Sequence, residues 1–150
     1  MALALVPPPL RFRLEVPLKR IGGALLDPVS MALRQPLDEV LAPFLDGKAA
    51  NDKEQRNRTW PLRLGQADEL VLDLHRLGVV RFAADGPQRL RVKMPYKLFM
   101  SLRDHLRSGM VTAATSADRT FSILILNLTN ATEPVVLPVG TTTISFKPPV

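Results

Sequence analysis

The stretch Leu10-Arg-Phe-Arg-Leu-Glu-Val16 decides what kind of fold to expect from this sequence. Apolar side chains occupy every second position of the stretch, and charged side chains occupy the positions between them. A period of two over seven residues predicts a β-strand with one face buried and the other in water. Pro17 directly after it predicts the end of the strand, because proline cannot donate a backbone hydrogen bond. We therefore expect a fold that contains a sheet.

Four later segments have strand features as well, and they cover residues 79–83, 89–94, 121–128 and 134–146. The first two are joined by a turn-rich linker that contains Gly86 and Pro87, which predicts a hairpin. The segment 121–128 is apolar at both alternating sets of positions, as in a central strand that is covered on both faces. Pro134 and Pro138 favour a place at the sheet edge for the last hairpin.

Three segments favour short helices, near 28–46, 66–77 and 96–107. Asp27 and Pro28 are typical of an N-cap followed by the first helical position. In the second segment Leu70, Val71, Leu74 and Leu77 form one apolar stripe of helical spacing. The predicted class is therefore α+β, with a mixed or antiparallel β-sheet, two or three short helices and proline-rich extended termini.

The chain has 150 residues, which is about the length of one domain. Residues 48–58 contain no large apolar side chain and are the best place for an internal boundary. We expect a single α+β domain over residues 1–150, with this polar loop inside it.

Composition argues against several kinds of reactive site. The sequence has no cysteine, which excludes disulfides, thiolate metal sites and cysteine nucleophiles. The two histidines, His75 and His105, are not part of a metal-binding spacing, so we expect no metal and no cofactor. Ser101 and His105 are four residues apart, but such a pair still needs an oxyanion donor. We predict that the protein is not an enzyme and has no catalytic residues.

The sequence shows no membrane or targeting signal. The apolar opening Met1–Val6 lacks a basic region and is followed by three consecutive prolines. This apolar stretch is too short for a signal segment. No run approaches the roughly 20 apolar residues of a spanning helix. We expect a protein without membrane contact, located in the cytoplasm or within an assembled particle.

The net charge of +6 is concentrated in one region. Residues 86–110 contain six basic side chains and one acidic side chain, that of Asp104. Alternate strand positions are about 7 Å apart, close to the spacing of phosphates along a nucleic-acid strand. We therefore predict a nucleic-acid or anion-binding face at the following residues: Arg81, Arg89, Arg91, Lys93 and Lys97.

A basic hairpin that follows an apolar helix is similar to the wing of a winged-helix DNA-binding domain. Here the resemblance covers about 50 residues, from Thr59-Trp60-Pro61-Leu62 through the predicted helix 66–77 to the hairpin. It implies that the hairpin cations contact phosphates. The sequence departs from the family because the exposed face of helix 66–77 carries Asp68, Glu69 and Asp73 instead of a basic recognition surface.

The proline-rich ends suggest a different function. Polyproline II segments lose little entropy when they bind, so such arms often dock on neighbouring subunits. The predicted docking residues of the two arms are Leu3, Leu5, Val6, Pro8, Pro148 and Val150. We interpret the chain as a non-enzymatic structural or assembly subunit, such as a virion component or part of another multi-subunit particle. Its partners would be other protein subunits in a homo- or hetero-oligomer, and nucleic-acid binding is the alternative.

Overall fold

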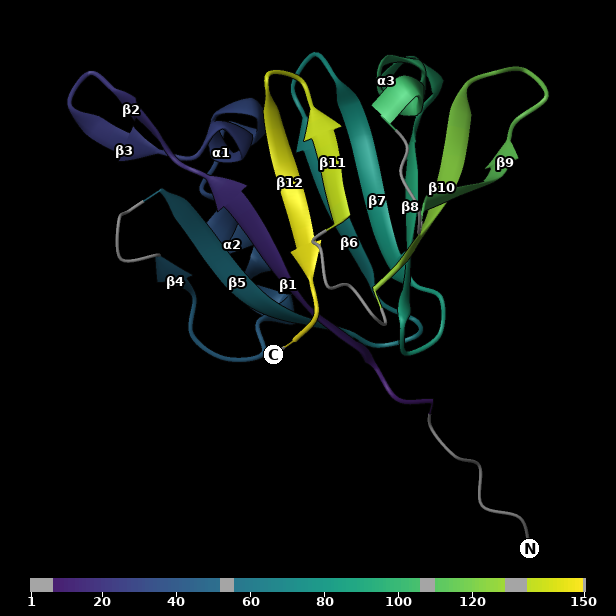
Figure 1. Cartoon of the computed structure of the whole chain (residues 1–150), viewed down its shortest axis with the longest axis horizontal. Coiled ribbons are helices and arrows are strands. Elements are labelled where there is room, and N and C mark those ends of the chain that lie inside the picture. Colours follow the sequence, from purple (N-terminus) through teal and green to yellow (C-terminus); the bar gives the residue numbers. More distant parts are fainter. Residues whose placement is uncertain (1–6, 52–55, 106–109, 129–134, 150) are drawn as a thin grey trace, which may run out of the picture.

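Two five-stranded antiparallel sheets form most of the molecule. The structure is a computed structural model, which describes residues 7–51, 56–105, 110–128 and 135–149 (Figure 1). The first sheet has the order β11-β12-β1-β5-β4, with the bounds β1 (Leu10–Pro17), β4 (Ala50–Asn51), β5 (Asn57–Leu64), β11 (Val135–Val139) and β12 (Thr142–Lys147). The second sheet has the order β6-β7-β8-β10-β9, with the bounds β6 (Glu69–Leu74), β7 (Gly78–Ala84), β8 (Arg89–Pro95), β9 (Met110–Thr115) and β10 (Phe121–Asn127).

The two sheets pack face to face around a shared apolar core. Every second residue is buried in β1, β6 and β8, and in β7 from Val80 onward, so each of these strands has one face toward the other sheet. The Phe146 ring of the first sheet lies 5.8 Å from the Phe82 ring of the second, measured between centroids. On its own sheet Phe146 lies 6.1 Å from Phe12. Aromatic contacts of this kind tie the sheets together.

Short helices lie at two sides of the molecule, and those on each side contact strands of both sheets. On one side lie α1 (Pro28–Leu33), α2 (Leu37–Leu41) and the 3-10 turn η1 (Ala42–Phe44). Here α1 contacts both β1 and β6 and so connects the two sheets. On the other side α3 (Tyr96–Leu102), followed by the 3-10 turn η2 (Arg103–His105), contacts β8, β10 and β11. Burial of Leu98 and Leu102 fixes α3 in that position.

A small hairpin stands apart from both sheets. It consists of β2 (Lys19–Ile21) and β3 (Ala24–Leu26), which among the described strands pair only with each other and which project at the upper left of Figure 1. Its turn is Gly22-Gly23, with φ of +58° and +86°. These angles favour glycine because it lacks a β-carbon. Of the six strand residues, Leu25 alone is half-buried and the others are exposed.

The predicted α+β class is confirmed in its broad form, as antiparallel sheet with short helices. Strands lie over the predicted segments 10–16, 79–83, 89–94 and 121–128, and a hairpin lies within 134–146. The short helices predicted near 28–46 are present as α1, α2 and η1, and the one predicted near 96–107 is present as α3 and η2, with residues 106–109 outside the described part of the chain. Pro138 lies in β11, an edge strand of the first sheet, as expected of proline in a sheet.

The helix predicted over 66–77 is wrong. Residues 69–74 form β6, in which Leu70, Leu72 and Leu74 are buried while the residues between them are exposed. Pairing with β7 stabilises the extended form, and Val71, expected on a buried helical stripe, is 37% exposed. The winged-helix resemblance therefore lacks the helix on which it depended.

Two further expectations need correction. The prediction that β10 is covered on both faces is wrong. One face is buried, but Phe121, Ile123 and Ile125 on the other face are only half-buried. The polar stretch 48–58 is not only a loop, since β4 and the start of β5 lie in it and 52–55 fall outside the described residues. Sequence reasoning missed β5, which contains Pro61 and begins with polar residues.

Candidate interaction surfaces

The basic residues of the β7–β8 hairpin lie on the outer face of the second sheet. Arg81, Arg89, Arg91 and Lys93 are all exposed, while the residues between them are buried or half-buried. Arg81 lies directly opposite Lys93 in the pairing of β7 with β8. The alternation predicted from the sequence therefore places these four cations on one side of the sheet. We call them the hairpin cations.

Neighbouring groups engage most of the hairpin cations. Arg81 Nη1 lies 2.7 Å from Glu69 Oε1 on β6, and Arg89 Nη2 lies 3.3 Å from Asp85 Oδ2. Lys93 Nζ lies 4.2 Å from the centroid of the Phe121 ring, within the range of a cation–π interaction. Carboxylates beside the cations reduce the positive potential available to a phosphate backbone.

The remainder of this outer face is apolar. Phe121, Ile123 and Ile125 of β10 are half-buried and lie beside β8. Ile123 is opposite Lys93, and Ile125 is opposite Arg91. Long basic side chains cover apolar neighbours with their methylene groups. The face thus combines acids on β6, cations on β7 and β8, and apolar side chains on β10.

The structure separates Lys97 from the hairpin cations. Lys97 lies on α3 and lines a recess of about 590 Å³ together with Arg76 and Arg119. Sequence reasoning missed both arginines, because they lie in turns 43 residues apart and belong to no recognisable motif.

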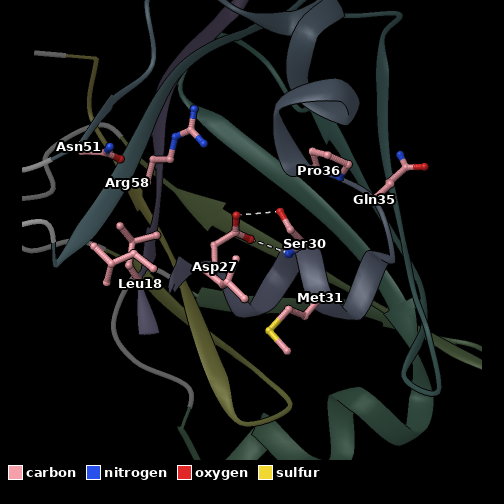
Figure 2. Close-up of a pocket in the computed structure, with 10 residues that line it drawn as sticks. Leu18, Asp27, Ser30, Met31, Gln35, Pro36, Asn51 and Arg58 are labelled. Carbon is pink, nitrogen blue, oxygen red and sulfur yellow. Dashed lines mark hydrogen bonds between the residues drawn. The ribbon is translucent and has the colours of Figure 1, made fainter. Parts of the chain in front are cut away.

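Figure 2 shows a second recess, of about 520 Å³, at the base of the β2–β3 hairpin. Its apolar lining includes Leu18 and Met31, and Met31 is 50% exposed. On the hairpin itself Ile21 and Leu26 are 43% and 39% exposed. These values are high for large apolar side chains. We call Ile21, Leu26 and Met31 the hairpin cluster.

Three polar residues of this recess, Asp27, Ser30 and Arg58, take part in hydrogen bonds and an ion pair that stabilise the fold. The Asp27 carboxylate accepts hydrogen bonds from the backbone amide of Ser30 at 2.5 Å and from its hydroxyl at 2.7 Å, as Figure 2 shows. This is the predicted N-cap of α1. Arg58 Nη2 lies 2.8 Å from Asp38 Oδ2, and the other oxygen of Asp38 accepts from Trp60 Nε1 at 2.7 Å. The recess therefore offers a partner apolar contact together with the polar side chains of Gln35 and Asn51.

The described parts of the two proline-rich ends lie close together. The Pro8 carbonyl accepts a hydrogen bond from Gln66 Nε2 at 2.8 Å, and the Pro148 carbonyl accepts one from Arg13 Nε at 2.8 Å. Pro9, Pro87, Pro148 and Pro149 all line one recess of about 260 Å³. The other predicted docking residues lie outside the described residues, and they are Leu3, Leu5, Val6 and Val150.

The described residues contain no group of three His, Asp or Glu side chains that could hold a metal ion. His75 is exposed, and its Nε2 lies 2.7 Å from Arg34 Nη2. The side chain of His105 is outside the described part of the chain. Within the same part, no helix has the length and apolar character needed to cross a bilayer.

Comparison of the chain with protein-family models, with curated proteins and with solved structures finds no match. The functional interpretation therefore depends on the geometry of these surfaces.

Proposed function

We propose that the chain is a structural or assembly subunit that binds other protein subunits through the β2–β3 hairpin. The observation that carries the proposal is the hairpin cluster. An isolated two-stranded hairpin is at best marginally stable in water and is stabilised by packing against another surface. In the described part of the chain the hairpin pairs with neither sheet, and it exposes Ile21 and Leu26, of which Leu26 lines the same recess as Met31 of α1. A docked partner would cover these apolar groups.

Charge defines what kind of partner fits. The strand residues of the hairpin include Lys19 and Arg20 and no acidic residue. Both basic residues are exposed, and Arg20 donates a long hydrogen bond of 3.3 Å to the carbonyl of Gly23. The chain as a whole carries a net charge of +6, which disfavours contact between many copies of it alone. The partner that matches is a protein with an apolar surface flanked by carboxylates.

The proline-rich arms extend the same proposal. β1 begins and β12 ends at the lower end of the molecule in Figure 1, whereas the hairpin projects at the upper end. Arms that leave the lower end would contact one neighbour while the hairpin contacts another. Two docking elements at opposite ends are suited to a subunit of a larger particle.

Native mass in an extract of the source cells tests the proposal. A tagged wild-type chain should sediment in a complex much heavier than its own 16.6 kDa. Ile21→Asp and Leu26→Asp should shift it toward the free chain, because each places a charge in the apolar contact. Val136→Asp is the matched control, since Val136 is also 40% exposed but lies on β11. Thermal melts of the purified variants should coincide with that of the control. A free wild-type chain, or equal shifts in all three variants, would contradict the proposal.

A second candidate function is nucleic-acid binding by the hairpin cations, favoured by their exposure on a single sheet face. A labelled duplex should then bind at about 50 mM salt, with strong salt dependence, and lose affinity when Arg89 and Arg91 become alanine. Absence of duplex binding at that salt concentration would exclude this function.

A further inference from the structure

The recess that contains Lys97 lies between three segments that are far apart in the sequence. The β6–β7 turn, the first part of α3 and the β9–β10 turn meet at the upper end of the molecule in Figure 1. The volume of about 590 Å³ is within the range of pockets for small organic ligands.

Each of the three segments contributes one cation to the recess, namely Arg76, Lys97 and Arg119. The lining contains no aspartate or glutamate. Among the described residues, no carboxylate lies within ion-pair distance of any of the three. Unlike Arg81 and Arg89, these cations therefore keep their charge available for a ligand.

The walls of the recess add apolar and hydroxyl groups. Leu77, Pro95 and Leu98 provide carbon surface, and the Tyr96 ring lies 6.2 Å from that of Phe99. The Tyr96 amide donates a 3.0 Å hydrogen bond to the Thr120 carbonyl, which joins α3 to the β9–β10 turn. A charged group could thus be held by the cations while its organic body contacts the apolar wall.

The backbone of the recess is held in a fixed arrangement. A β-carbon at Gly78 would lie 2.6 Å from Cγ of Pro95, so the start of β7 and the start of α3 approach as closely as glycine permits. This contact fixes Arg76, two residues before Gly78, relative to Lys97, two residues after Pro95. Prearranged cations lose less entropy on binding a ligand.

Arg76 and Arg119 both have positive φ, at 70° and 56°. Asparagine and glycine adopt this conformation more readily than arginine, because an ordinary side chain crowds the backbone there. Arginine at these turn positions therefore disfavours the local backbone conformation. Of the three described residues other than glycine that have a positive φ, Arg34, Arg76 and Arg119, two line this recess.

We propose that this recess binds a small organic molecule bearing a multiply charged oxyanion, either phosphate or carboxylate groups. Guanidinium groups form paired, charge-assisted hydrogen bonds with both kinds of oxyanion. Three cations from separate segments match a ligand with two or three negative charges. This inference is independent of the hairpin cluster, which lies on other residues.

Titration calorimetry at constant ionic strength tests the proposal with two probes, inorganic pyrophosphate for phosphates and citrate for carboxylates. At least one should bind more tightly than sulfate, and the stronger binder identifies the preferred oxyanion. Arg76→Asn and Arg119→Asn should each weaken that binding about tenfold or more, as expected for a lost charge-assisted contact. Both variants should melt at or above the wild-type temperature, because asparagine suits a positive φ. Lost binding would then not reflect unfolding.

Arg34→Asn is the matched control. Arg34 also has a positive φ, of 60°, but it does not line the recess. Its replacement should have the same effect on the backbone. It also removes the contact with His75, the residue before Arg76, but no cation that lines the recess, so the affinity for the probe should stay unchanged. Neither probe binding better than sulfate would overturn the proposal. Equal losses of affinity in Arg34→Asn and Arg76→Asn would overturn it as well.

Discussion

The outer face of the β7–β8 hairpin and the recess beside α3 are both basic, but they differ in what surrounds their cations. On the hairpin face Arg81 and Arg89 have carboxylate partners, and Lys93 lies over an aromatic ring. In the recess the cations have no carboxylate partner among the described residues. The number of basic residues in a segment is therefore a poor guide to its affinity for anions. The neighbours that the fold supplies decide how much charge is available.

The two regions also differ in backbone geometry at glycines of positive φ. Gly86 in the β7–β8 turn has φ +83° and no atom within 4 Å of an added β-carbon. Gly78 beside the recess has φ +102°, and its β-carbon would contact Pro95. Gly86 therefore needs only a positive φ, whereas at Gly78 there is also no room for a β-carbon beside Pro95.

The largest expected effect follows from this difference. Gly86→Ala should lower the free energy of unfolding by about 1–2 kcal/mol, the cost of a positive φ for a residue with a β-carbon. Gly78→Ala should lower it by about 2–5 kcal/mol, because overpacking against Pro95 adds about 1–3 kcal/mol. Urea denaturation of both variants measures the two values. Equal losses would show that the close approach at Gly78 does not constrain the recess.

Sequence periodicity predicted much of the fold where one period was unambiguous. The alternation in 10–16 and 89–94 gave correct strands with the correct buried faces. The cation alternation on β8 was also predictable, since it depends only on the strand period. Gly22-Gly23 is typical of a turn, but the strand before it begins with Lys19 and Arg20, so no apolar pattern in the sequence indicates the β2–β3 hairpin.

The errors arose where two periods fit the same residues. Leu70 and Leu74 are buried both in a helix with a stripe at four-residue spacing and in a strand with a two-residue period. Pairing with β7, a contact that a local pattern does not contain, selects the strand. The recess beside α3 was beyond sequence reasoning for a related reason. Its cations at 76, 97 and 119 come together only through the packing of two turns against a helix.

A smaller effect is expected from removing the carboxylate partner of one hairpin cation, which tests whether this ion pair contributes to stability. Glu69→Gln removes the partner of Arg81, and both side chains are about half exposed, at 49% and 45%. We expect a loss of less than about 1 kcal/mol in the free energy of unfolding, because solvent screens exposed ion pairs. The loss should shrink further at 1 M salt, where the screening length is about 3 Å.

Asp73→Asn is the control for this ion pair. Asp73 is also exposed on β6, and it forms no ion pair with a described residue. Its replacement should leave the salt dependence of unfolding unchanged. If Glu69→Gln and Asp73→Asn change the salt dependence of unfolding equally, the Arg81–Glu69 ion pair does not contribute to stability beyond the net charge of this face.

The smallest expected effect concerns Asp118, which precedes Arg119 in the β9–β10 turn. Hydrogen bonds from the Ser116 hydroxyl, then from the Thr120 hydroxyl and amide, hold the pKa of Asp118 below its ordinary value of 3.8. A carboxyl whose pKa is lower in the folded state stabilises the fold above its unfolded pKa, and this contribution is lost as the pH falls through the folded pKa. Stability of the wild type should therefore decline below about pH 4, and Asp118→Asn should remove a small part of that decline. Thermal melts between pH 2 and pH 7 measure it. Identical profiles for the two proteins would mean that the β9–β10 turn does not depend on this charge, and that Arg119 is positioned by the backbone alone.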